Sequence, residues 1–246
     1  MKRHAALVLL LFVAVCAGSA RALRGGFPPV EAILEKYINA LGGREALEKI
    51  TTMALRGTME FPEFGASGTT AEYVKDPDHF VAITDVPGYG TVRTIYDGHN
   101  GWAVDPQRGT SEITGGDLAD LKRRADIHWN LKLQEYYPRL KVLSRESVGG
   151  KDAWQLEATV EGWTYDFWFD VDSGLLVRFD TDRHTADGAS TVTIGDYRRV
   201  GAVLFAFSAA RSGAPIAWNR TLTDVKFNEP FDDAVFAKSP PNEQPK

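Results

Sequence analysis

The stretch 163–169 carries an aromatic side chain at every second position, and a turn signal follows at 170–174. Because successive side chains of a β-strand point to opposite faces, these aromatic residues are predicted to share one face. They are Trp163, Tyr165, Phe167 and Phe169. Apolar residues then alternate again at Leu175, Val177 and Phe179. The pattern predicts an antiparallel hairpin with one strongly apolar face, which a second sheet, a helix or a ligand must cover.

Other patterns predict helices. Apolar residues recur with helical spacing over 30–41, between a Pro-Pro pair and a Gly-Gly pair, and a short second helix is predicted over 44–50. Asp117 is predicted to cap a third helix over 117–137, which Pro138 ends. Trp129 and Leu133 lie on the apolar side of this third helix.

Alternation and turn signals predict strands in two groups. The first group lies at 52–61, 68–75, 80–84, 91–96, 101–104 and 110–113. The second lies at 140–147, 153–160, 163–169, 175–179, 190–198, 203–211 and 217–227. No linker or low-complexity segment separates the groups. We therefore predict one domain in which a curved sheet of roughly a dozen strands is capped by helices.

The N-terminus has the composition of a secretory leader. Lys2 and Arg3 precede the uncharged run 5–17, and Ala20-Arg21-Ala22 offers a cleavage site. We predict a signal peptide over 1–22 and a mature domain over 23–246. The apolar run is shorter than the roughly 20 residues that a membrane span needs, and no later segment is apolar enough.

The single cysteine, Cys16, lies in this leader. The preceding residues Val13-Ala14-Val15 resemble a lipobox only weakly, so a lipid-anchored outer-membrane protein is the less favoured alternative. With the leader removed no cysteine remains, which excludes disulfides, thiolate catalysis and cysteine-ligated zinc. Loss of the leader's Lys2, Arg3 and Arg21 also takes the net charge from −5 to about −8, which disfavours nucleic acid and anionic membrane surfaces as partners.

The sequence offers no convincing catalytic or metal constellation. Asp170, Asp172 and Gly174 resemble the opening of a calcium loop, but Thr181 stands where such a loop needs its last carboxylate, and a hairpin turn explains the same residues. The histidines show no metal-binding spacing, and no G-x-S-x-G motif or phosphate loop occurs. We predict no cofactor, no metal and no enzymatic activity. A hydrolase whose residues converge only in the folded chain is a third alternative.

The order of elements resembles the LolA-like superfamily of outer-membrane lipoprotein-sorting proteins and periplasmic lipoprotein carriers. The resemblance rests on the leader, on the helix end Tyr-Ile-Asn-Ala-Leu-Gly-Gly at 37–43, on the strand meander with its helical insertion, and on the aromatic hairpin at 167–178. It implies a half-open antiparallel β-barrel, mainly β with α, whose apolar inner face is covered by a helical lid. Arg56 and Arg178 lie on predicted strands and are candidates for the arginine that holds the lid in such carriers.

The resemblance implies a non-catalytic periplasmic carrier, chaperone or sensor that binds lipoprotein acyl chains, lipid or another hydrophobic ligand. The predicted cavity-lining residues are Trp129, Leu133, Trp163, Tyr165, Phe167, Phe169, Val177 and Phe179. The alternative is a periplasmic interaction module whose barrel is a solid core and whose surface docks an envelope protein partner. A continuous cavity under the helices favours the carrier, and a packed interior favours the module.

Overall fold

The structure is a computed structural model, and it describes residues 26–182 and 189–238. The predicted signal peptide 1–22, including Cys16, lies outside the described residues. Over the two described ranges, no helix combines the length and the apolar character that crossing a membrane requires.

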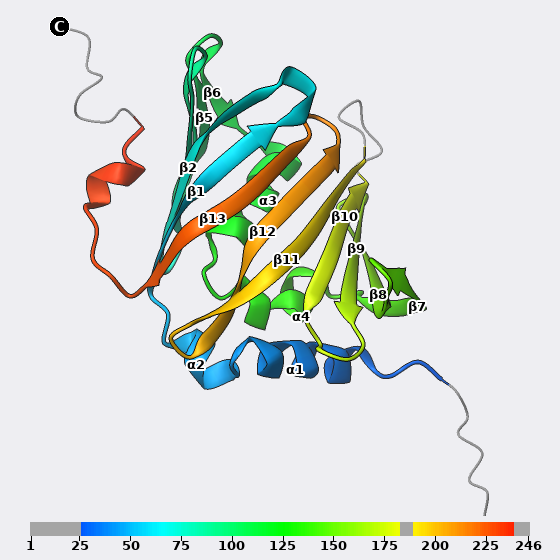
Figure 1. The fold of residues 1–246 in the computed structure, drawn as a ribbon. Coiled ribbons are helices and arrows are strands. Elements are labelled where there is room, and N and C mark those ends of the chain that lie inside the picture. The colour runs from blue at the N-terminus through cyan, green and yellow to red at the C-terminus, as the bar shows by residue number, and fades with distance from the viewer. Residues whose placement is uncertain (1–25, 183–188, 239–246) are drawn as a thin grey trace, which may run out of the picture.

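All the strands in the described ranges form one antiparallel sheet, which is curved and not closed (Figure 1). Its order is β6-β5-β4-β3-β2-β1-β13-β12-β11-β10-β9-β8-β7. The first seven strands are β1 (Thr52–Phe61), β2 (Ala66–Lys75), β3 (His79–Val86), β4 (Gly90–Asp97), β5 (Gly101–Asp105), β6 (Gly109–Ile113) and β7 (Lys141–Val148). The others are β8 (Lys151–Val160), β9 (Trp163–Asp170), β10 (Leu176–Asp182), β11 (Ser190–Val200), β12 (Val203–Gly213) and β13 (Trp218–Phe227). The predicted half-open barrel is confirmed.

The helices take up three places around the sheet (Figure 1). Helices α1 (Val30–Leu41) and α2 (Arg44–Glu48) lie across one end of it, and α1 ends at the predicted Gly42. Helix α3 (Gly115–Ala125), the 3₁₀ turn η2 (Trp129–Leu131) and helix α4 (Leu133–Tyr136) follow β6 along one face, which we call the inner face. The 3₁₀ turns η1 (Pro62–Phe64) and η3 (Asp233–Phe236) lie in the β1–β2 connection and after β13.

The third helix is shorter and more broken than predicted. The helix starts at Gly115, with Thr114 rather than Asp117 at its N-cap, and it stops at Ala125. The reason is Asp126, whose backbone is extended and whose carboxylate accepts hydrogen bonds from the His128 amide (2.9 Å), Lys132 Nζ (2.7 Å) and the Tyr136 hydroxyl (2.5 Å). A buried carboxylate with these donors fixes a turn where apolar periodicity predicts a continuous helix.

The aromatic hairpin is present, but a bulge changes the face that its return strand presents. Leu176 lies opposite Phe169 and Phe179 lies opposite Phe167, with an irregularity between Leu176 and Arg178. The prediction that Leu175, Val177 and Phe179 share a face fails at Val177, because a bulge inserts one residue there and shifts the alternation; Leu175 and Phe179 both pack against the inner core cluster. Leu176 takes the inner position instead, and Val177 stands at the irregularity.

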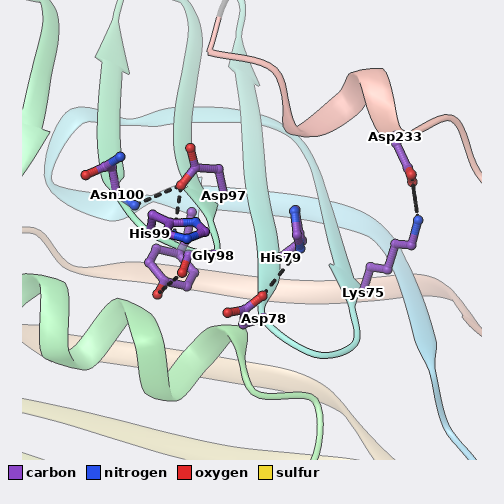
Figure 2. A network of polar contacts seen from close by, with 9 residues as sticks. Lys75, Asp78, His79, Asp97, Gly98, His99, Asn100 and Asp233 are labelled. Atoms are coloured by element: carbon purple, nitrogen blue, oxygen red, sulfur yellow. Dashed lines mark hydrogen bonds and ion pairs between the residues drawn. The ribbon is translucent and has the colours of Figure 1, made fainter.

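The opposite, outer face of the sheet is covered in part by the segment after β13. Phe236 packs on Val81 and Ile95, and Arg93 donates a hydrogen bond of 2.8 Å to the Val235 carbonyl. Figure 2 shows the ion pair that joins Asp233 of this segment to Lys75 of β2. Lys75 Nζ lies 2.6 Å from the nearer carboxylate oxygen of Asp233. The same view shows the turn after β4, where the Asp97 carboxylate accepts the His99 and Asn100 amides.

Candidate functional site

Helix α3 connects two parts of the sheet that are far apart in strand order. On one side, Leu121 and Ala125 pack in one cluster with Val74, Phe80 and Tyr96 of β2, β3 and β4. On the other side, α3 contacts β9 through Gly116 and through the polar residues Asp120 and Arg123. Strands β1, β13, β12, β11 and β10 lie between these two contact regions. The helix therefore spans the concave side of the sheet, as a lid would.

Two glycines allow α3 to lie close to the sheet. A β-carbon on Gly116 would stand 2.3 Å from the nearest ring carbon of Trp163, so this position of α3 admits no side chain. Beneath the other half of the helix, a β-carbon on Gly101 of β5 would stand 2.8 Å from a methyl group of Leu121 and 3.2 Å from one of Leu118. The position of α3 thus depends on close contact at its start and at its middle.

Polar contacts hold α3 to β9. The Tyr165 hydroxyl donates to the Asp120 carboxylate at 3.1 Å and accepts from Arg123 Nη2 at 2.9 Å, and Arg123 also pairs with Asp120. The Arg123 guanidinium lies 5.3 Å from the Tyr165 ring centre. Burial raises the pKa of Tyr165, and the Asp120 charge raises it further, so the hydroxyl keeps its proton and remains a donor.

A second polar link joins α3 to the middle of the sheet. Glu72 Oε2 lies 3.8 Å from Arg124 Nη2 on α3 and 3.4 Å from Arg220 Nη1 on β13. We call these three residues the Arg124–Glu72–Arg220 group. This group and the contacts at Tyr165 attach α3 to the inner face at two places. Side chains form both attachments.

The predicted aromatic face meets helix α1 and the residue after α4. The Phe169 ring centre lies 5.1 Å from that of Tyr37, and Tyr137 lies 5.0 Å from Tyr165 and 4.9 Å from Phe167. We call these five residues the aromatic cluster. All five are buried, and they pack with Leu133 in the largest core cluster of the described chain. This part of the inner face is covered by protein.

The predicted site residues fall into two sets. Leu133, Tyr165, Phe167 and Phe169 are buried, with exposed fractions of 2% or less. Trp129, Trp163 and Phe179 are half-buried and pack against the same cluster. Val177 is half-buried at the bulge of β10 and does not belong to that cluster. The structure therefore brings seven of the eight predicted residues together on the inner face.

Apart from Trp163 and Tyr165, the residues that attach α3 were not predicted as site residues. Glu72, Arg124 and Arg220 come from three distant parts of the sequence, and Arg220 lies 148 residues from Glu72. The two candidate lid arginines lie elsewhere. Arg56 hydrogen-bonds to Tyr73, which contacts Phe231 of the outer-face segment, and Arg178 stacks on Trp168 and pairs with Asp180. Helix α3 supplies Arg124 to the Arg124–Glu72–Arg220 group, and the sheet supplies both Glu72 and Arg220.

The Asp170 loop is a hairpin turn, as its flanking strands predict. The Asp170 carboxylate accepts the amides of Asp172 and Ser173 and the Ser173 hydroxyl at 2.6 to 3.1 Å. Burial opposes its ionisation, but these bonds lower the pKa of Asp170 below its ordinary value. Within residues 26–182 and 189–238, no three His, Cys, Asp or Glu side chains gather in a way that could hold a metal ion.

Comparison with known proteins identifies the fold. No protein-family model and no curated protein matches the sequence. Among solved structures, a DUF1329 family protein from Desulfovibrio piger has a TM-score of 0.60 at 12% identity, over 86% of this chain and 98% of that one. A LolA superfamily protein from Nitrosomonas europaea has a TM-score of 0.56 at 14% identity, over 86% of this chain and 99% of that one.

A putative outer-membrane lipoprotein-sorting protein domain from Vibrio parahaemolyticus is also similar. Its TM-score is 0.53 at 17% identity, over 83% of this chain and 97% of that chain. At these identities the likeness concerns the fold rather than the function. The predicted resemblance is confirmed at that level: the chain has the fold of LolA superfamily structures.

Proposed function

We propose that the protein is an exported periplasmic carrier or sensor that binds a hydrophobic ligand between α3 and the inner face of the sheet, without catalysing a reaction. The observation that carries this proposal is the attachment of α3. The helix spans the concave side of an unclosed sheet, and only side-chain contacts join it to β9 and to Glu72. Such contacts can separate and re-form without loss of the sheet.

The half-buried aromatic residues are the proposed walls. Trp163 lies under the start of α3, Trp129 lies in η2, and Phe179 lies opposite Phe167 on β10. Each of these three side chains is partly exposed and can contact a ligand, whereas Phe167 and Phe169 are buried in the core behind them. Burial of an acyl chain is worth about 0.8 kcal/mol per methylene group, so a chain of ordinary length supplies affinity even when it is only partly enclosed.

The proposed ligands are lipoprotein acyl chains or lipids, in line with the lipoprotein-sorting domain whose fold this chain shares. The compartment follows from the predicted leader 1–22, and an outer-membrane lipoprotein anchored at Cys16 remains the less favoured form. In either case lipid binding, transport and outer-membrane lipoprotein sorting are the processes in which such a carrier takes part.

A second candidate is an interaction module that docks an envelope protein partner and carries no ligand. The observation in its favour is the aromatic cluster, in which Tyr37 and Tyr137 already cover Phe167 and Phe169. A protein whose inner face is occupied throughout in this way has no room for an acyl chain. The two candidates therefore differ in whether a ligand binds between α3 and β9.

The experiment that separates them is native mass spectrometry, with lipid extraction, of the protein purified from the periplasm of a bacterium that expresses the complete sequence. A carrier is expected to yield bound lipid or to take up a fluorescent fatty acid with saturation at one site. Repeated recovery of empty protein that takes up no fatty acid would rule out the carrier and favour the interaction module.

A further inference from the structure

The Arg124–Glu72–Arg220 group lies on the inner face, as the strand register shows. Glu72 stands opposite Leu55 of β1, and Arg220 stands opposite Met59 of the same strand. Leu55 and Met59 are four residues apart, so they and their partners share a face. Glu72 also shares a face with Val74, which packs against α3. The two side chains therefore point toward the helix that carries Arg124.

The charges of this group do not balance. Both guanidinium groups approach the same oxygen of Glu72, at 3.8 Å and 3.4 Å, which leaves most of their donors free of that carboxylate. Arg220 Nε is buried and has no hydrogen-bond partner among the described residues. The nearest other carboxylate on α3, that of Asp120, is already paired with Arg123 and Tyr165. Two guanidinium groups and one carboxylate give the group a net charge of +1.

The group remains accessible although it lies between the helix and the sheet. The Arg124 side chain has 53% of its surface exposed, and those of Arg220 and Glu72 have 24% and 17%. Desolvation nevertheless lowers the pKa of Arg124, and the Arg220 charge adds to this, while Glu72 and Asp120 oppose it. A guanidinium group whose side chain is about half exposed is one that an anion can reach and pair with.

Apolar surface surrounds this positive charge. The Arg124 guanidinium lies 4.6 Å from the ring centre of Phe80, and Arg220 has Met59 beside it across the strand pair. Leu222, two residues along β13 on the same face, is part of an apolar cluster with Leu55 and Val225. A single polar position set among apolar side chains matches a molecule with one charged end and a hydrocarbon body.

We propose that the Arg124–Glu72–Arg220 group receives the anionic head group of an amphiphilic ligand, whose hydrocarbon chain lies along the inner face toward Trp163. This inference rests on the proposed function and specifies the ligand class. The recognised chemistry is a carboxylate or phosphate attached to an acyl chain, because a guanidinium pair can donate several hydrogen bonds to either group. Glu72 holds the two arginines in the absence of ligand and competes with it.

The test is a titration of the full protein, freed of copurified lipid, with three probes of matched chain length. Palmitic acid, above its pKa, carries a carboxylate; lysophosphatidic acid with a palmitoyl chain carries a phosphate; hexadecanol is neutral. We expect either acid to bind at least about tenfold more tightly than hexadecanol, the size of effect that one charge-assisted hydrogen bond provides. The stronger of the two acids identifies the natural head group.

Variants locate the effect. Arg220→Gln, and independently Arg124→Gln on the exposed side of α3, should each lower the ratio of acid affinity to hexadecanol affinity about tenfold. Glu72→Gln should change acid binding in the opposite direction, because it removes the competing carboxylate. Arg56→Gln, an outer-face arginine of β1, is the matched control and should change neither. Circular dichroism and thermal melting establish that each variant is folded.

The outcomes separate this inference from the proposed function. Equal binding of hexadecanol and palmitic acid would overturn the head-group assignment and leave a hydrophobic-ligand carrier in place. Acid selectivity that survives both arginine variants would overturn it as well, because the selectivity would then arise elsewhere. Failure of all three probes to bind would refute the proposed function itself, and the assignment with it.

Discussion

Gly116 of α3 and Trp163 of β9 lie so close together that a β-carbon on the glycine would stand 2.3 Å from the indole ring. In an isolated helix, replacing glycine by alanine stabilises by about 1 kcal/mol. Here we expect the reverse, a destabilisation of about 1–3 kcal/mol by overpacking, because the ring must shift or α3 must lift. Urea unfolding measures the change, and hydrogen exchange of the α3 amides shows whether the lid has lifted.

The matched control for Gly116→Ala is Gly195→Ala in β11. The β-carbon of that variant would meet only the Ser208 hydroxyl, at 3.3 Å, and a hydroxyl can rotate away. We expect a change within about 0.5 kcal/mol, as for ordinary surface substitutions. If Gly116→Ala proves as stable as the wild type, then α3 does not rest on Trp163.

The Tyr165 hydroxyl links the lid to the sheet, and Tyr165→Phe removes that link while it keeps the ring. The variant loses the bonds to Asp120 and Arg123, so we expect about 1 kcal/mol of destabilisation and faster hydrogen exchange in α3. Tyr137→Phe is the control, because its hydroxyl forms no hydrogen bond within the described residues. Equal exchange rates in α3 for both variants would show that this contact does not hold the lid.

Asp166 on the outer face of β9 stands opposite Glu157 on one side and Asp180 on the other. Burial raises the pKa of Asp166; the Gln155 hydrogen bond opposes this rise, and the two carboxylates add to it. The folded state therefore binds this proton more strongly than the unfolded state, and ionisation of Asp166 reduces stability above its folded pKa.

Asp166→Asn should accordingly stabilise the protein at neutral pH by up to about 1 kcal/mol, the scale of a cross-strand like-charge pair. The advantage should shrink as the pH falls through the folded pKa toward the ordinary carboxylate value, because the wild-type group is then protonated. Thermal melting over a pH series checks this, with the exposed Asp172→Asn as the control. An advantage that does not change with pH would point to a cause other than the charge.

Phe167→Asp tests whether the aromatic cluster is a solid core. Phe167 is 2% exposed and lies 4.9 Å from Tyr137 and 5.2 Å from Phe179, ring centre to ring centre. A carboxylate there has no partner, so we expect a loss of several kcal/mol and an unfolded or molten chain by circular dichroism. A folded Phe167→Asp variant that no longer takes up fatty acid would instead make Phe167 a residue of a hollow binding site.

Strand positions could be predicted closely because each strand alternates over several residues between clear turn signals. The predicted strand 153–160 lies within β8, and the predicted helix 30–41 coincides with α1. The curved sheet capped by helices was predicted from the residue pattern, whereas its half-open, barrel-like form followed from the resemblance. The aromatic face could be predicted because four aromatic residues at a spacing of two have one geometric interpretation in a strand.

Other features depend on contacts that periodicity does not contain. The break at Asp126 arises because Lys132 and Tyr136 bring donors back to its carboxylate, and the shift at Val177 arises from a bulge. The Arg124–Glu72–Arg220 group was missed because its members meet only when β2, β13 and α3 come together. A signal did exist for Glu72, since a lone carboxylate in the middle of a predicted strand needs a partner.

The central claim is that a hydrophobic ligand binds between α3 and the inner face of the sheet. The most direct measurement is hydrogen exchange of the wild-type protein with and without saturating palmitic acid. The account predicts slower exchange at 115–125 in α3 and at 163–169 in β9, with no change at 233–236 on the outer face. Uptake that slows exchange only at the outer face, or no uptake at all, would contradict it.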